Sequence, residues 1–210
     1  MIQRDASQPL REEYYTIEEY LSFERTSEIK HEYVDGQIMA MAGASRVHNL
    51  ITGNVSRRLG NQLEGKPCET YASDLRVKTT ATDYTYPDVI VVCEEPEFED
   101  REVDTLLNPT VLVEVLSKST EKRDRVEKFA DYRGITHLKE YILISQDKMH
   151  VEHYVRQPDN EWRLYDVNEP GGKIRIESIG CELLLSEVYE RVKFLPPRQL
   201  RKVAEDEEQQ

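Results

Sequence analysis

The sequence has little of what marks a membrane or secreted protein. No run of its 210 residues approaches the roughly 18 apolar residues of a membrane-spanning helix. The N-terminal segment MIQRDASQPLREEYY is polar and lacks the apolar core of a signal peptide. These absences predict a cytoplasmic protein without a membrane segment.

Cysteine is also scarce. The three cysteines, Cys68, Cys93 and Cys181, are odd in number and far apart, and no Cys-x-x-Cys pair occurs. This pattern predicts a reducing compartment and argues against a disulfide framework or a thiolate zinc site.

Positive charge is in deficit, because 28 Lys and Arg face 41 Asp and Glu and the net charge is −13. Such a chain repels nucleic acid on average, so binding DNA would need a local basic patch or bridging cations. Residues 117–133 supply a modest patch. Contacts to phosphate are expected from its basic residues Lys118, Lys122, Arg123 and Arg125.

The N-terminal half predicts two helices and a hairpin. Thr16 and Glu19 match a capping box for a helix that runs to about Arg25. An Asp-Gly pair within residues 31–40 indicates a tight β-hairpin. Apolar residues at four-residue spacing predict a helix over residues 46–63.

The remainder alternates between strands and a helix. A helix is expected over residues 118–134, capped by Ser119 or Thr120, and a helical turn over 186–191. The acidic stretch 94–104 is expected to be a solvated loop. Strands are expected at 68–77, 86–93, 111–116, 140–144, 150–156, 162–166 and 174–176. This order predicts an α/β (α+β) fold with a mixed sheet, without an internal linker.

Two carboxylates stand out within apolar strands. Asp88 opens the run DVIVVC and Glu114 interrupts LVEVL. A carboxylate in an apolar strand is costly unless it is paired, hydrogen-bonded or bound to a metal. Two of them on adjacent strands would suit Mg²⁺, which prefers oxygen ligands. The alternative is that both bridge the sheet through Arg, Lys or backbone donors.

Over residues 14–195 the chain resembles the Uma2 family of the PD-(D/E)XK restriction endonuclease-like superfamily. The ordered series that carries this resemblance is YTIEEYLSFE, HEYVDGQIMAMAG, YPDVIVVC, PTVLVEVLSKST and DRVEKFADYRGITHLKEYILI. The resemblance implies a mixed central β-sheet flanked by helices, with an N-terminal helix and hairpin and a C-terminal β-rich extension. Residues 1–13 and 196–210 are expected to be flexible ends of this single domain.

The resemblance also implies an activity, a metal-dependent endonuclease that hydrolyses DNA phosphodiester bonds with Mg²⁺ or Mn²⁺. Asp88, Glu114 and the backbone carbonyl of Val115 would be the metal ligands. The chain departs from the superfamily pattern at Leu116, where a lysine is expected. Lys128 is the candidate replacement.

Lys128 follows Glu114 by fourteen residues, and Asp124, Lys128 and Tyr132 share one face of the predicted helix. If that helix packs over the strand ends, Lys128 reaches the carboxylates. The alternative is an ordinary pair of Asp124 with Lys128 on a solvated face.

Two further residues are candidates for the site. Glu32 in the hairpin is the candidate additional acid, with Glu28 as a weaker choice, and an exposed hairpin glutamate is the competing interpretation. His48 opens a helix, where it would contact phosphate or polarise water, unless it is structural. Asp74 is expected to be a structural partner of Arg76 or of another arginine.

A second class of function stays open from the sequence. The chain would then be a non-catalytic nucleic-acid-binding or regulatory module that keeps the nuclease fold, as the missing lysine and the acidic charge favour. An unrelated hydrolase of small phosphoesters has no supporting motif. Cutting both strands of DNA would be easier for a two-fold homodimer, which is a geometric expectation only.

Overall fold

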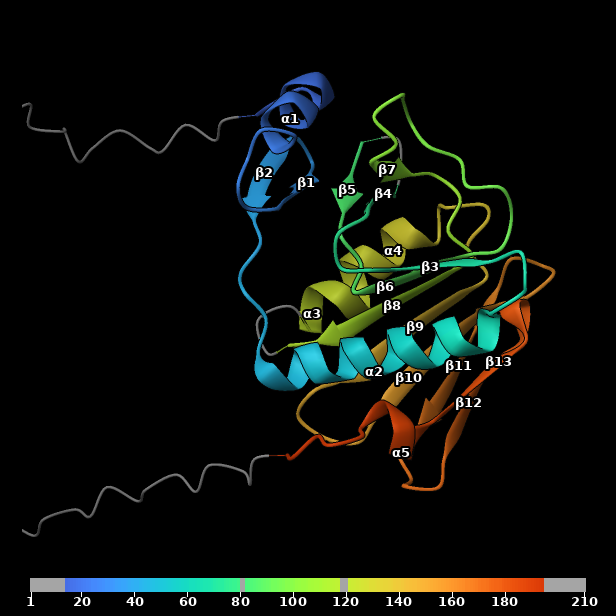
Figure 1. Cartoon of the computed structure of the whole chain (residues 1–210). Helices are drawn as coiled ribbons and strands as arrows, with labels where there is room; N and C mark the ends of the chain where they lie inside the picture. Colours follow the sequence, from blue (N-terminus) through green and yellow to red (C-terminus); the bar gives the residue numbers. More distant parts are fainter. Residues whose placement is uncertain (1–13, 80–81, 118–120, 195–210) are drawn as a thin grey trace, which may run out of the picture.

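The computed structural model describes residues 14–79, 82–117 and 121–194 and has a mixed α+β fold (Figure 1). The helical segments are α1 (Ile17–Glu24), α2 (Arg46–Leu63), α3 (Glu121–Arg123), the π-helix η1 (Asp124–Lys128), α4 (Phe129–Tyr132), the 3-10 helix η2 (Glu177–Ile179) and α5 (Leu185–Val188). The strands are β1 (His31–Val34), β2 (Gln37–Ala40), β3 (Glu69–Ala72), β4 (Arg76–Lys78), β5 (Tyr84–Thr85), β6 (Val89–Val92), β7 (Thr105–Leu106), β8 (Val111–Leu116), β9 (Glu140–Ser145), β10 (Val151–Arg156), β11 (Trp162–Val167), β12 (Lys173–Ile176) and β13 (Cys181–Leu184). The predictions for the flexible ends and for the caps at Ser119 and Thr120 lie outside the described residues.

The strands form more than one sheet. The largest has six strands in the order β11-β10-β9-β8-β6-β3, and a second has the order β2-β1-β5-β4-β7. β8 pairs with β9 in parallel, whereas β8 with β6 and β9 with β10 are antiparallel. The expected mixed central sheet is confirmed. The second sheet and the pair β12-β13 were not predicted.

The six-stranded sheet is covered on both faces. Figure 1 shows α2 on one side of β6 and β8, with α3 and α4 on the other. In β8, Val111, Val113 and Val115 pack into the core that contains α2. The alternate residues Leu112 and Leu116 pack into the opposite core, which contains residues of α4. Side chains alternate along a strand, so Glu114 points to the α4 side.

The N-terminal predictions hold in detail. Thr16 and Glu19 form the capping box, since the Thr16 hydroxyl accepts from the Glu19 amide at 3.2 Å and Glu19 accepts from the Thr16 amide at 2.8 Å. Asp35 and Gly36 both have positive φ, 49° and 83°, which is the backbone that a tight hairpin turn requires. The hairpin therefore turns at the Asp-Gly pair, where the sequence predicted the turn.

The strand expected over residues 68–77 is wrong in its length. Strand β3 ends before Ser73, whose φ is 59°, and the chain continues as β4 in the other sheet. The Ser73 amide donates to the Asp88 carbonyl at 3.1 Å, which anchors the turn to the start of β6. Asp74 is a structural partner as expected, but its cation is Lys30 at 2.9 Å.

The helix expected over residues 118–134 is interrupted. Its central five residues, Asp124–Lys128, form a π-helix between two short α-helical segments. Both ends of the π-helix are buried, since Asp124 is 2% and Lys128 is 6% exposed. The alternative of a solvated face for Asp124 and Lys128 is therefore wrong, because these two charged side chains point into the protein.

The expectation that the cysteines form no disulfide is also wrong, because Cys68 and Cys93 are bridged. Glu69 pairs with Val92 in the antiparallel β3–β6 ladder, so the two cysteines lie opposite each other at its end. Their Cα atoms are 4.0 Å apart. The separation of 25 positions along the chain hid this contact from the sequence pattern. Cys181 is a buried free thiol.

The acidic stretch 94–104 is more ordered than the expected solvated loop. Glu99 pairs with Lys78, and Arg25 binds both Asp100 at 2.7 Å and Asp104 at 2.8 Å.

Among the described residues, no helix is long and apolar enough to cross a membrane.

Candidate active site

Asp88 and Glu114 lie across from each other at one end of the β6–β8 pair. The last paired residues of that ladder are Val89 and Val113, and the two carboxylates lie one position beyond. Asp88 Oδ2 accepts a hydrogen bond from the Val115 amide at 2.7 Å. Its Oδ1 lies 2.7 Å from His48 Nε2. The strands thus place both predicted acids at one sheet end.

Glu114 is held by two donors from the helical segment above the sheet. Its Oε1 accepts from Lys128 Nζ at 3.0 Å and from the Tyr132 hydroxyl at 2.8 Å. Thr85 Oγ1, from the second sheet, lies 2.9 Å from the same hydroxyl. Glu114 is 5% exposed, so these bonds satisfy a carboxylate that is almost removed from water.

Lys128 is the centre of the charged network. Its Nζ lies 3.0 Å from Glu114 Oε1, 3.0 Å from Glu32 Oε1 and 3.5 Å from Asp124 Oδ1. Glu32 also pairs with Arg123. The pairing with Asp124 and the approach to Glu114 were alternatives in the sequence, and the structure contains both.

The charges shift one another. Burial acts against ionised Lys128, but Glu114, Glu32 and Asp124 raise its pKa well above the ordinary value. Burial also acts to raise the pKa of Glu32, yet Lys128 and Arg123 outweigh it and the pKa is lowered. Lys128 therefore keeps its proton, and in this arrangement it is a fixed cation and not a proton acceptor.

Glu114 behaves differently from Glu32. Burial raises the pKa of Glu114 above its ordinary value despite Lys128, and the nearby Asp124, Asp88 and Glu32 raise it further. The ionised form of Glu114 is therefore disfavoured by burial and by the neighbouring negative charge. A cation placed beside it would relieve that strain.

His48 is placed by the first turn of α2. Ser45 is the N-cap, and its hydroxyl accepts from the His48 amide at 3.1 Å. The His48 side chain is 17% exposed and the Asp88 side chain 14% exposed. This pair is the part of the site that water reaches most easily, beside the more buried Glu114 and Lys128.

All five residues predicted as catalytic thus lie in two adjoining networks. Glu32, Lys128 and Glu114 form one, and Asp88 and His48 form the other, joined to the first through β8. Glu28, the weaker alternative, is exposed. Tyr132 and Thr85 were missed as hydrogen-bonding residues. The spacing from Asp124 to Tyr132 indicated the shared face, but nothing in the sequence brings Thr85 to it.

The expected phosphate-binding residues are only partly free. Arg123 pairs with Glu32, and Arg125 pairs with Glu152 at 2.7 Å and with Glu121. Lys122 is exposed, and Lys118 lies outside the described residues.

The donor set fits a hard divalent cation in its chemistry. Four carboxylates, from Glu32, Asp88, Glu114 and Asp124, face two permanent cations, Lys128 and Arg123. These four carboxyl groups outnumber the two cations, and the nearby acids add to the rise in the pKa of Glu114. Mg²⁺ or Mn²⁺, which prefer oxygen ligands, would compensate such a group of carboxylates. Within the described ranges, no three acidic, histidine or cysteine side chains already converge on one metal position. Binding would therefore use fewer side chains, together with the backbone carbonyl of Val115 and water.

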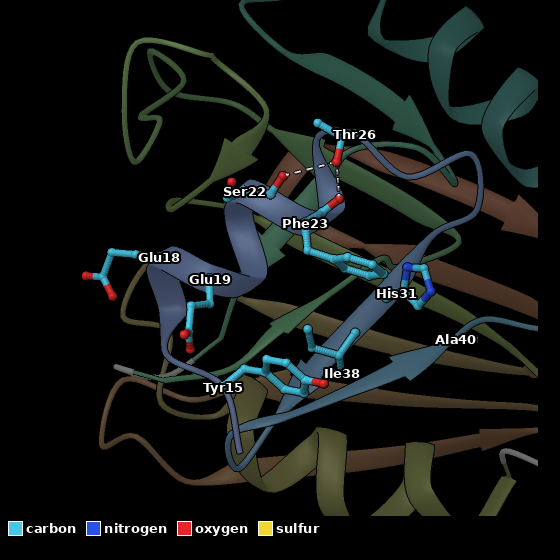
Figure 2. A pocket seen from close by; sticks show the side chains of 9 residues that line it. All are labelled: Tyr15, Glu18, Glu19, Ser22, Phe23, Thr26, His31, Ile38 and Ala40. Carbon is cyan, nitrogen blue, oxygen red and sulfur yellow. Dashed lines mark hydrogen bonds between the residues drawn. The ribbon is translucent and has the colours of Figure 1, made fainter. Parts of the chain in front are cut away.

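A groove of about 850 Å³ lies elsewhere, beside α1 and β2. Figure 2 shows Phe23, His31, Ile38 and Tyr15 around it, with Glu18 at one end. As far as the described residues define its lining, none of the five predicted catalytic residues borders it. Strand β1 separates the two regions, since His31 faces the groove and Glu32 faces Lys128.

Comparisons with known proteins agree with the geometry. The Uma2 family model, described as "Putative restriction endonuclease", matches residues 17–186. Two uncharacterized proteins of a Synechocystis strain are similar. Protein sll1609 is 40% identical over 153 residues (72% of this chain, 86% of its own), and slr1290 is 35% identical over 178 residues (84% and 92%).

A solved structure supports the fold. The crystal structure of a "putative nuclease belonging to DUF820" from Anabaena variabilis has a TM-score of 0.64 with this chain at 18% identity. The match covers 83% of this chain and 97% of that one. At this identity it is the fold that is shared. On the family match and the two relatives, this chain belongs to the Uma2 family of restriction endonuclease-like proteins.

Proposed function

We propose that the chain is a metal-dependent endonuclease that hydrolyses DNA phosphodiester bonds at the Asp88–Glu114 end of the sheet. The observation that carries the proposal is the buried cluster of three carboxylates around Lys128 with Asp88 at the same end of the β6–β8 pair, so that four carboxyl groups outnumber the cations Lys128 and Arg123. A network that only stabilises the fold does not require more carboxyl groups than cations, whereas a site for a divalent cation does.

In this proposal Asp88, Glu114 and the Val115 carbonyl hold Mg²⁺ or Mn²⁺, and Glu32 adds a ligand directly or through water. The cation would supply charge that polarises the scissile phosphate and lowers the pKa of a bound water. Lys128, as a permanent cation, stabilises the negative charge that develops on the phosphate. His48 orients Asp88 and offers its ring at the more open edge of the site.

The test is cleavage of supercoiled plasmid and of single-stranded DNA with Mg²⁺ or Mn²⁺. Glu114→Gln and Lys128→Ala should each lower the rate by about 10²-fold or more, as loss of a transition-state charge partner does. The matched controls are Glu127→Gln and Lys193→Ala, both exposed, which should cut like wild type. Linear product formed together with nicked product would indicate paired sites, as in a homodimer.

The second candidate is a non-catalytic nucleic-acid-binding module. Leu116 favours it, because an apolar side chain occupies the strand position where the superfamily pattern has lysine. Absence of cutting by wild type, with retained DNA binding, would select this function over the nuclease. Cutting that Glu114→Gln leaves unchanged would reject the proposed site.

A further inference from the structure

Three aromatic rings from three different elements meet on the outer side of α4, β10 and β11. Phe129 lies 4.3 Å from Tyr154 and 5.4 Å from Trp162, measured between ring centroids. All three side chains are partly exposed. Leu164 of β11 is 49% exposed, and Val126 of the preceding π-helix η1 is 60% exposed.

Two arginines lie over these rings. The guanidinium carbon of Arg133 is 5.2 Å from the centre of the Phe129 ring, and that of Arg156 is 4.8 Å from the centre of the Trp162 ring. Within the part of the chain that the structure describes, neither arginine forms an ion pair with a carboxylate. Arginines on other surfaces do, for example Arg25 with Asp104.

The two arginines differ in what they offer. Arg156 donates to the carbonyls of Arg133 and Ile135 at 2.7 and 2.9 Å, so it closes the end of α4. Burial lowers its pKa, and no anion offsets that effect. Arg133 is exposed, so its guanidinium is free to meet a ligand while resting on Phe129. Arg156 adds to the local positive field.

This surface is unusual for a chain with a net charge of −13. Partly exposed rings edged by uncompensated guanidinium groups suit a ligand with flat aromatic faces and negative charge. A single nucleic-acid strand has both, whereas the bases of a duplex are stacked on one another. Trp162 also borders a hollow of about 400 Å³ at the β10–β11 turn, so its indole is reachable from outside.

We propose that Phe129, Tyr154 and Trp162 form a platform that binds single-stranded nucleic acid, with bases packed against the parts of the rings that Arg133, Arg156 and Tyr141 leave open and a phosphate bound by Arg133. The choice of nucleic acid as the ligand rests on the proposed function. The platform adds to that function a preference for single-stranded over double-stranded nucleic acid. Phe129 directly follows Lys128 along the chain, so a strand on the platform would lie beside the helix that carries the site lysine.

The test uses the single tryptophan of the chain, Trp162, as an intrinsic probe. Glu114→Gln protein without divalent cations is titrated with oligothymidylate at low salt, so that no cutting occurs. We expect quenching of the Trp162 fluorescence, because a base stacks on the indole. Anisotropy of a labelled oligonucleotide, read in parallel, should give the same dissociation constant.

Two surface variants separate a specific platform from general charge. Arg133→Gln should weaken binding several-fold and lower the salt slope by about 0.7, the value for one phosphate contact on a single strand. Arg175→Gln is the matched control, since it removes an equal charge from an exposed arginine of β12. It should bind like the parent.

Three results would overturn the platform. These are absence of quenching, equal loss in both arginine variants, and equal quenching by poly-glutamate, which would indicate an acidic peptide as the partner. The outcome is independent of the cleavage assay. Binding without cutting would reject the nuclease and keep the platform, and cutting with unaltered Trp162 fluorescence would do the reverse.

Discussion

Lys128 works as a fixed positive charge, because three carboxylates surround its ammonium in a site almost closed to water. Removing one partner of a buried ion pair costs more than the pair contributes, since the remaining charges are left without compensation. The network therefore makes stability as well as chemistry depend on this residue. The contribution of Lys128 to stability should therefore change with pH.

We expect Lys128→Met to lower the free energy of unfolding by about 3 kcal/mol at pH 7. Without Lys128, Glu32, Glu114 and Asp124 raise one another's pKa, so the folded variant takes up protons as the pH falls. The unfolded chain does so only near pH 4. The loss should therefore be smaller at pH 5 than at pH 7.

Urea unfolding at the two pH values measures this difference. Lys193→Met, at an exposed position, is the control and should unfold like wild type at both. An equal loss at pH 7 and pH 5 would mean that Lys128 matters only for packing.

Asp104 gives a second pH prediction at the residue scale. Burial acts to raise its pKa, but Arg25 and Arg76 lower it to about 2. Because the folded pKa lies below the unfolded one, the stabilisation is present above about pH 4 and is lost as the pH falls toward 2. The Asp104 side chain is 32% exposed, so screening keeps the contribution to about 1 kcal/mol.

Asp104→Asn should therefore unfold at a lower temperature than wild type at pH 7, and the difference should shrink steadily as the pH falls from 4 toward 2. Thermal unfolding followed by circular dichroism reads both. The exposed Asp147→Asn is the control. A difference that persists in acid would assign the effect to something other than the ion pairs.

The site residues were predictable to the extent that their environment shows in the sequence. Asp88 and Glu114 are identified because each interrupts an apolar strand. Lys128 is identified from the family resemblance and its spacing. The link from Thr85 through Tyr132 to Glu114 was not, because it joins two sheets across 47 residues and each residue is ordinary in its own segment.

At the scale of elements, periodicity predicts α2 and β8 well, since each buries a regular apolar face. It fails where the chain changes partner. Residues 68–77 look like one strand, yet Ser73 turns the chain from one sheet to the other. Sheet membership depends on distant pairing, and a local pattern carries no signal for it.

The π-helix at Asp124–Lys128 is a similar case. The sequence predicts a continuous helix, and local propensity does not distinguish the wider turn. A π-helical insertion places one extra residue in the helix and is typical of functional sites. Here Asp124 and Lys128 stand at its two ends, and both side chains are buried in the carboxylate cluster.

The β3–β6 ladder carries the prediction at this scale. The disulfide closes a chain segment of 25 residues at the open end of edge strand β3. In the chain-entropy model, a cross-link over such a segment stabilises the folded state by about 3.5 kcal/mol. Dithiothreitol should lower the free energy of unfolding of wild type by about this amount.

The double variant Cys68→Ser/Cys93→Ser should show the reduced stability from the start and should not respond to dithiothreitol. Cys181→Ala keeps the disulfide and should still respond. Wild type that unfolds identically with and without reductant would show that the two cysteines are not bridged in solution.

At the scale of the whole molecule, negative charge occurs in two forms, spread over the chain and gathered in a buried cluster. The chain is acidic on average, and a separate group of buried carboxylates lies at the end of β6 and β8. General acidity attracts any cation weakly, and high salt screens it. A buried cluster in which carboxyl groups outnumber cations would instead favour a compact divalent ion. Stability measurements distinguish these effects.

We expect Mn²⁺ or Mg²⁺ to raise the melting temperature of wild type, because a ligand that binds only the folded state stabilises it by about 2.7 kcal/mol at 100 times its dissociation constant. Glu114→Gln and Asp88→Asn should lose most of this increase, since each removes a proposed ligand. Glu127→Gln, which removes one exposed charge, should keep it. The comparison is of the metal-induced shift within each variant, because the variants also differ in their metal-free stability. An equal shift in Glu114→Gln and Glu127→Gln would assign the effect to surface charge and would leave the carboxylate cluster as an ion-pair network without a metal.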